Sequence, residues 1–233
     1  MDLIVRGVRQ AFELLLRGDP EVMEIMWLSL RVSGLATALS LLVGVPVGMA
    51  LALRRFPGRT LVLAAINSGM GLPPVVVGLV ASILLWRTGP LGFLDLLYTP
   101  AAIVAAQFVL AVPVVAGLTA AAVQQLDPRL RVQLAGLGAS RLQTLAWLLH
   151  EARLPLLAAV MAGFGAVISE VGASMMVGGN ILHYTRVLTT ATVLETSKGN
   201  FDVAIALSVV LLAVTFCVTV VVTAVQQRGA KVQ

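Results

Sequence analysis

Charged residues are scarce in this chain of 233 residues, where they make up 12% of the sequence. That is about half of the charged share of an average soluble domain. Hydrophobic residues make up 59%. This balance excludes an ordinary soluble domain. It predicts a single all-α integral membrane domain over residues 1–233, with no second folded unit.

Cysteine and aromatic residues are also few. The lone cysteine, Cys217, excludes an internal disulfide and lies in an apolar stretch, where packing is its simplest role. Aromatic residues are 5% of the chain and do not cluster with basic ones, so the net charge of +5 does not indicate nucleic-acid binding. His150 and His183 are isolated, without metal-ligand spacing. A Gly-x-x-x-x-Gly-Lys-Ser/Thr phosphate loop is also lacking, so a partner would have to bind any nucleotide.

Long apolar runs predict five membrane-spanning helices, because one span needs about 20 apolar residues. The runs cover residues 32–53, 60–86, 96–126, 154–177 and 203–227. The first 20 residues predict an amphipathic helix on the membrane surface rather than a signal peptide. Within the second run, Pro73 and Pro74 free backbone carbonyls in mid-membrane. They indicate either a local kink in tight small-residue packing or a broken helix that lines a pathway.

The distribution of basic residues predicts the orientation of the chain. The connections after the first, third and fifth predicted spans would all lie on one side of the membrane. Their only acidic residues are Asp127 and Glu151. Their basic residues are Arg54, Arg55, Arg59, Arg129, Arg131, Arg141, Arg153, Arg228 and Lys231. Basic loops stay in the cytoplasm. We therefore expect a multi-pass protein of the cytoplasmic membrane with its N-terminus outside and its C-terminus inside.

The segment 127–153 reads DPRLRVQLAGLGASRLQTLAWLLHEAR and mixes charge, glycine and leucine between two apolar runs. Asp127 followed by Pro128 is typical of a helix start. Gly136 and Gly138 would break the helix or permit a close approach, so the pattern predicts a helix, a glycine turn and a second helix. If the leucines of this second helix face the membrane, Arg141 and Gln143 remain for a partner. The leucine series is Leu134, Leu137, Leu142, Leu145 and Leu148.

This segment resembles the cytoplasmic loop of the inner-membrane permease subunits of bacterial ABC importers. That loop has the form Glu-Ala-Ala, three residues, Gly, nine residues, Ile-x-Leu-Pro. The family glycine corresponds to Gly138, within the run LGAS at 137–140. The Glu-Ala-Ala positions are VQL here, and the Leu-Pro positions are HE, with an actual Leu-Pro four residues later.

A second run, AGFGAVISEVGASMMVGGN at 162–180, is similar to the fourth span of oxyanion importers. It looks closest to the tungstate permeases, and molybdate permeases share it less closely. The runs YTRVLTT at 184–190 and LETSKG at 194–199 also look like that family. The resemblance therefore covers nearly the whole chain.

The resemblance implies an ABC importer permease (MetI-like) fold and a division of labour among subunits. An extracellular binding protein would deliver the oxyanion, which is tungstate or, as the alternative, molybdate or another oxyanion. Two copies of this chain, a homodimer in membrane lipid, would form the pathway. Two ATP-binding subunits would dock under the loop and hold ATP and Mg²⁺, so this chain itself would bind no cofactor. A coupling helix over 139–149 would involve Gly138, Ala139, Ser140, Arg141 and Leu142.

Glu170 is the only acidic residue deep in an apolar run. A charge there costs at least ~2.5 kcal/mol, which makes it a functional candidate. Because a carboxylate repels an oxyanion, we expect Glu170 to be protonated, paired or part of a gate. The alternative is an acid bonded to the backbone of a neighbouring helix. We expect Arg31 to reach the outer interface by snorkelling, and the alternatives are a pair with Glu170 or attraction of anions. Ser169, Ser174 and Asn180 supply neutral donors, which suit an anion that must pass without sticking.

Two other classes of protein are possible on the sequence. A membrane enzyme would need converging acid, base or metal groups, and the sequence offers no His/Asp cluster. A self-contained channel or carrier would need no ATPase, and the basic loop would then be only a topology signal. Co-purification of an ATP-binding protein separates these alternatives.

Overall fold

The computed structural model describes residues 2–230, and within that range it consists of helices and connections without a strand. Lys231, which belongs to the predicted basic tail, lies outside the described residues. The helices are α1 (Asp2–Arg17), α2 (Pro20–Leu53), α3 (Arg59–Gly69), α4 (Pro74–Leu85), the short 3₁₀ helix η1 (Gly92–Leu94), α5 (Pro100–Gln124), α6 (Pro128–Gly136), α7 (Arg141–Glu151), α8 (Arg153–Ile168), α9 (Gly172–Gly178), α10 (Leu188–Ser197) and α11 (Phe201–Ala230).

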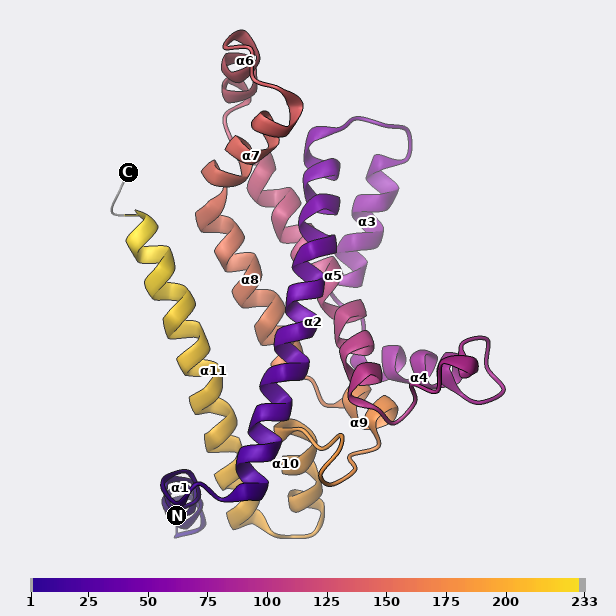
Figure 1. Cartoon of the computed structure of the whole chain (residues 1–233), viewed down its shortest axis with the longest axis vertical. Coiled ribbons are helices and arrows are strands. Elements are labelled where there is room, and N and C mark those ends of the chain that lie inside the picture. Colours follow the sequence, from indigo (N-terminus) through magenta and orange to yellow (C-terminus); the bar gives the residue numbers. More distant parts are fainter. Residues whose placement is uncertain (1, 231–233) are drawn as a thin grey trace.

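Four helices, α2, α5, α8 and α11, run along the long axis of the molecule (Figure 1). The helical pair α6 and α7 lies at one end, here called the α6–α7 end. Helices α1 and α10 lie at the opposite end, the α1–α10 end, and α4 projects to the side. The ends of the described chain, Asp2 in α1 and Ala230 in α11, therefore lie toward opposite ends of the molecule, as an odd number of spans requires.

Three of the helices, α2, α5 and α11, are each long and apolar enough to cross a membrane. Two bent pairs raise the number to 5 if each pair counts as one span: α3 with α4, and α7 with α8. The first pair bends by 100° at a break that contains Pro73, so the second predicted span is a broken helix rather than a kinked one. This outcome follows from the ring of each proline, which cannot continue the helical hydrogen-bond ladder.

The fourth predicted span, residues 154–177, is wrong as one continuous helix. Helix α8 ends at Ile168, and the short α9 starts at Gly172. Hydropathy did not predict this break. It depends only on how apolar the side chains are, and it carries no information on where a side chain replaces a backbone group as hydrogen-bond partner. Helix α2 also starts earlier than predicted, at Pro20, where the side chain of Asp19 accepts a bond from the backbone N–H of Val22 at 3.1 Å.

Small residues bring α2 and α5 close together. A Cβ atom at Gly48 would lie 2.5 Å from the carbonyl oxygen of Ala116 and 2.7 Å from Cβ of Thr119. Such close backbone approach is the usual way in which helices pack in membranes. A core cluster that includes Val32, Ile103 and Val177 then ties α2, α5 and α9 into one body.

Helix α1 confirms the predicted amphipathic helix. Its Gly7 is so close to α11 that an added Cβ would lie 2.5 Å from Cβ of Ile205. Phe12 and Leu16 are exposed, at 59% and 85%. An exposed apolar side on a helix of this kind suits the surface of a bilayer.

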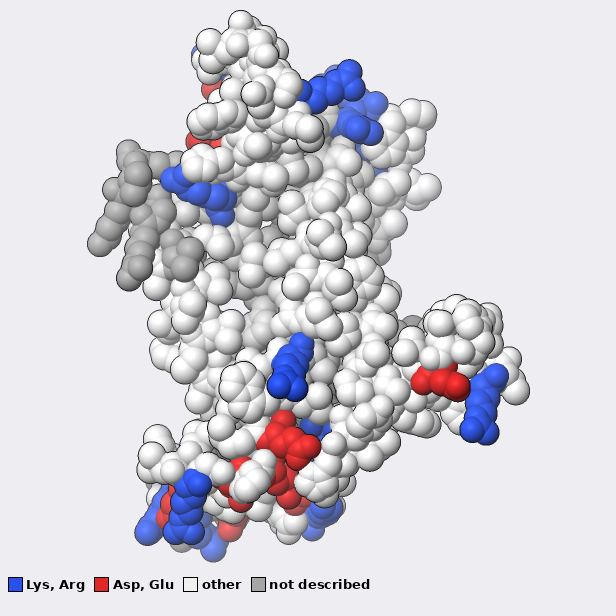
Figure 2. Space-filling view, in the orientation of Figure 1, with Lys and Arg blue, Asp and Glu red and all other residues white. Residues whose placement is uncertain are grey.

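Charged side chains avoid the middle of the molecule. Figure 2 shows coloured residues mainly near the two ends and beyond α4, with a largely white band between them. Blue residues outnumber red ones beside α6 and α7, whereas red residues gather together with blue ones at the α1–α10 end. This asymmetry agrees with the predicted placement of the α6–α7 end in the cytoplasm, and that placement stays a prediction.

Candidate coupling and translocation sites

The connection between α6 and α7 is a glycine turn, as the sequence predicted. Gly138 has φ +78°, the left-handed region that glycine adopts without strain. Around it, the N–H of Ala139 donates to the carbonyl of Leu134 at 3.0 Å, which closes the end of α6. No atom lies within 4 Å of the place where a Gly138 Cβ would stand. Within this chain, Gly138 therefore serves the sharp turn and not a close approach of another segment in residues 2–230.

Helix α7 starts at Arg141, two residues later than the predicted 139, because Ser140 caps it. The side chain of Ser140 accepts from the N–H of Gln143 at 3.3 Å, and the N–H of Ser140 donates to Oε1 of Gln143 at 2.8 Å. This reciprocal pair is a capping box, which fixes the direction in which the helix starts. The turn and the cap together hold α7 at a defined angle to α6.

All five predicted coupling residues lie at or near the surface. Gly138, Ser140, Arg141 and Leu142 are exposed, and Ala139 is half-buried. The leucine series does not share one environment within the chain. Leu134 and Leu148 are buried, but Leu137 and Leu142 are 84% and 79% exposed and add apolar area to the outer surface. An exposed surface with both apolar and basic groups is suited to a protein partner.

Glu170 lies in the break between α8 and α9 and is 5% exposed. Its Oε1 accepts from the N–H of Ala173 at 2.6 Å. Its Oε2 accepts from the N–H of Ser174 at 3.0 Å and from the hydroxyl of Ser174 at 2.7 Å. The carboxyl group thus satisfies two N–H groups that a helix start leaves without partners. The partner of Glu170 is the start of α9, not Arg31, which lines an outer pocket with Trp27.

The structure brings only two of the four predicted pathway residues together, Glu170 and Ser174. Ser169 is exposed, and its hydroxyl donates to the carbonyl of Gly165 in its own helix at 2.7 Å. Asn180 has φ +51°, and its amide donates to the carbonyl of Thr190 at 3.4 Å. These two residues therefore support their own local backbone, whereas the Glu170–Ser174 pair holds the break in the span.

Sequence reasoning missed the neighbours that hold this break from two other helices. Gln107 of α5 is 2% exposed and donates to the carbonyl of Val167 at 3.0 Å and to Oγ of Ser174 at 3.5 Å. Thr189 of α10 donates to the carbonyl of Glu170 at 2.9 Å. A polar amide in the middle of an apolar span was the available signal for Gln107. We call Glu170, Ser174, Gln107 and Thr189 the α8–α9 clasp.

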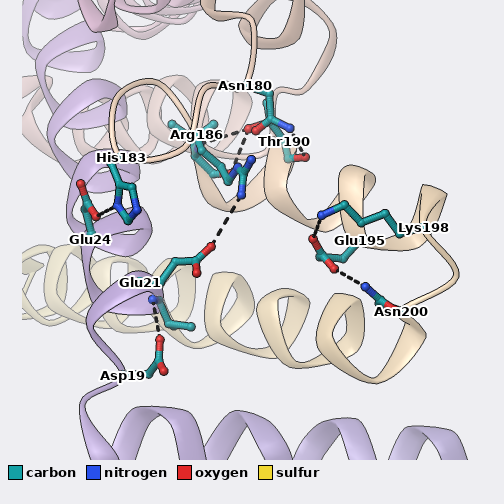
Figure 3. A network of polar contacts seen from close by, with 12 residues as sticks. Asp19, Glu21, Glu24, Asn180, His183, Arg186, Thr190, Glu195, Lys198 and Asn200 are labelled. Atoms are coloured by element: carbon teal, nitrogen blue, oxygen red, sulfur yellow. Dashed lines mark hydrogen bonds and ion pairs between the residues drawn. The ribbon is translucent and has the colours of Figure 1, made fainter.

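An ion pair and a histidine–carboxylate contact at the α1–α10 end join the start of α2 to the segment after α9 (Figure 3). Nδ1 of His183 lies 2.7 Å from Oε2 of Glu24, and Arg186 lies 3.6 Å from Glu21. His183 is exposed, as a surface histidine should be, and it has a carboxylate partner that is distant in sequence.

Glu195 belongs to the same network (Figure 3). Its carboxylate accepts from Nζ of Lys198 at 2.8 Å and from the amide of Asn200 at 2.7 Å. These two bonds, first that from Lys198, lower the pKa of Glu195 below its ordinary value. Glu195 thereby ties the end of α10 to the turn that leads into α11. Across residues 2–230, no three His, Cys, Asp or Glu side chains converge as a metal site would require.

Comparison with known proteins identifies the fold and the family of this chain. The chain resembles a solved structure described as inward-facing conformations of the MetNI methionine ABC transporter, with a TM-score of 0.74, 18% identity, and coverage of 90% of this chain and 96% of that one. The fold is therefore that of an ABC importer permease, the MetI-like fold. A family model for the binding-protein-dependent transport system inner membrane component matches residues 44–231. The chain belongs to this family.

Two relatives match over nearly the whole chain. The tungstate uptake system permease protein TupB of Peptoclostridium acidaminophilum is 40% identical over 228 residues, which cover 98% of this chain and 100% of that protein. The tungstate uptake system permease protein TupB of Campylobacter jejuni is 34% identical over 217 residues, which cover 93% and 91%.

Proposed function

We propose that this chain is the membrane-spanning subunit of an ATP-driven importer that carries tungstate across the cytoplasmic membrane. The observation that carries the proposal is the identity of 40%, over 98% of the chain, to a protein named as a tungstate uptake permease. The substrate would be delivered by a separate binding protein, in keeping with the description of the family. The chain would act in translocation, and ATP hydrolysis would occur in a different subunit.

The exposed α6–α7 end supports the proposed arrangement of partners. Its turn at Gly138 and the capped start of α7 present a defined surface at one end of the spans. Two ATP-binding subunits, which hold ATP and Mg²⁺, would dock there in the cytoplasm. The chain would act as a homodimer, because its few spans are too few to enclose a pathway alone. The α1–α10 end would then face the binding protein outside.

The α8–α9 clasp supports a positioning role for Glu170 in this proposal. A carboxylate repels a divalent oxyanion, and both oxygens of Glu170 are turned toward the start of α9. Glu170 would therefore not touch the anion. It would hold the broken span in place while neutral donors and backbone line the passage. Such an arrangement lets an anion pass without binding tightly.

The test is cellular tungsten and molybdenum, measured by mass spectrometry in cells with and without this chain at trace concentrations of both anions. Selective loss of tungsten in cells without the chain is the expected result. Equal loss of both elements would widen the substrate to molybdate as well, because the two anions are nearly equal in size and charge. No loss of either element would overturn the proposed substrate.

The need for an ATPase is tested separately by purifying the chain from its native membrane. An ATP-binding protein should co-purify with it, and uptake in vesicles should require ATP. Uptake by the purified chain alone would instead support the channel or carrier.

A further inference from the structure

A cavity of about 730 Å³ lies between the end of α2, helix α6 and helix α7. Its lining includes three arginines from these three elements, Arg54, Arg131 and Arg141. None of the three is paired with a carboxylate in residues 2–230. All three side chains are exposed, so water weakens their mutual repulsion, but the lining holds three positive charges and no acidic residue. The charge of the cavity therefore favours an anionic occupant.

The remaining walls of the cavity restrict the kind of anion. Leu53, Val132 and Leu148 also line it, so apolar surface adjoins the guanidinium groups. Leu53 is the last residue of α2, one of the helices that can span the membrane, so the cavity adjoins the end of a candidate span. Figure 2 shows basic side chains on this part of the surface, beside the α6–α7 end. An occupant with an anionic head and apolar chains matches both kinds of wall.

We propose that this cavity binds the headgroup of an anionic phospholipid. The phosphate would lie among the arginines, whose planar donors match phosphate oxygens, and the acyl chains would follow Leu53 into the bilayer. The proposal uses the cytoplasmic placement of the α6–α7 end and so rests on the proposed function. Because one wall is α7, a bound lipid braces the predicted coupling helix against α2. A free tetrahedral oxyanion shares the phosphate chemistry but leaves the apolar walls without a partner.

Two double variants with equal change of charge provide the test. Arg54→Gln with Arg131→Gln removes two arginines of the cavity. Arg55→Gln with Arg129→Gln removes their neighbours, which are exposed but do not line the cavity. The chain, purified with whatever partners accompany it, is titrated in detergent with phosphatidylglycerol, and native mass spectrometry counts the bound lipid. Phosphatidylcholine with the same acyl chains is the control for headgroup charge.

An arginine near anionic lipid contributes about 1 kcal/mol, which is roughly fivefold in affinity. Phosphatidylglycerol should therefore bind roughly 25-fold more weakly to the Arg54/Arg131 variant than to the wild type. The Arg55/Arg129 variant should bind it nearly as tightly as the wild type does. An equal loss in both variants would mean general attraction to a basic surface and would overturn the site. So would unchanged binding in the Arg54/Arg131 variant. Displacement of the lipid by inorganic phosphate or tungstate at equal concentration would overturn the lipid in favour of a free anion.

This experiment does not depend on transport. Specific lipid binding can be present even if tungsten uptake is normal without the chain, and it can be absent from a working importer. The two proposals can therefore fail independently.

Discussion

Glu170 shows how one residue reconciles an acidic side chain with an apolar span. Its carboxyl group accepts three bonds from the start of α9, and its backbone carbonyl accepts a fourth from Thr189. In the membrane, each backbone group released by the break must find such a partner. The residue that appeared as an anomaly in the sequence is thus what makes the break possible.

The α8–α9 clasp predicts a graded loss of stability. In Glu170→Gln, the new amide NH₂ group replaces one acceptor oxygen, so at least one donor of α9 loses its partner. A buried donor without a partner costs about 1–3 kcal/mol. The thermal midpoint of the purified protein should fall. It should fall less in Ser174→Ala, which removes the hydroxyl donor to Oε2 of Glu170 and the long 3.5 Å acceptor of Gln107 but leaves both N–H groups of α9 paired. Equal midpoints for wild type and Glu170→Gln would contradict this role.

At the scale of helices, the α6–α7 hairpin depends on the left-handed residue at its turn. Gly138→Val places a branched side chain at φ +78°, which costs about 1–2 kcal/mol, a factor of roughly 5–30 in population. We expect normal membrane insertion but ATP hydrolysis that no longer drives uptake. Both quantities are measured in reconstituted vesicles.

Two further substitutions make the Gly138 experiment specific. Asparagine tolerates the left-handed region, so Gly138→Asn should retain more uptake than Gly138→Val. Gly136→Val is the matched control, because Gly136 also has no atom within 4 Å of its Cβ position but does not have a positive φ. Full coupling in Gly138→Val would show that the turn does not matter for transport.

The elements show which parts of this fold can be predicted from sequence. The hairpin was predictable, because Asp127, Pro128 and Gly138 each act on their nearest neighbours in the chain. The break after Ile168 was not, because its supports, Gln107 and Thr189, are far away in sequence. The early start of α2 was missed for another reason. An apolar run predicts only the part of a helix that can cross a bilayer, whereas α2 extends before that run to Pro20.

The molecule as a whole has a charge asymmetry that predicts its orientation. In a chain with Cys217→Ser, single cysteines are placed at Leu137 and at Tyr184, which are 84% and 49% exposed at opposite ends. A maleimide that does not cross membranes should label Tyr184→Cys in intact cells. It should label Leu137→Cys only after the membrane is opened. The reverse pattern would invert the proposed topology and place the arginine-lined cavity outside.

The contact between α1 and α11 also has a consequence for how the molecule is made. The ribosome produces Gly7 early, but its neighbour Ile205 emerges only after nearly all of the chain. Until then Leu14 and Leu15 of α1, which pack in the complete structure against a core cluster that includes Leu207 of α11, need another apolar surface. The bilayer supplies one, so the lipid acts as a temporary chaperone for the first helix. Completion of the last helix then moves this side of α1 from lipid to protein, so the first helix reaches its final packing only after α11 has been made.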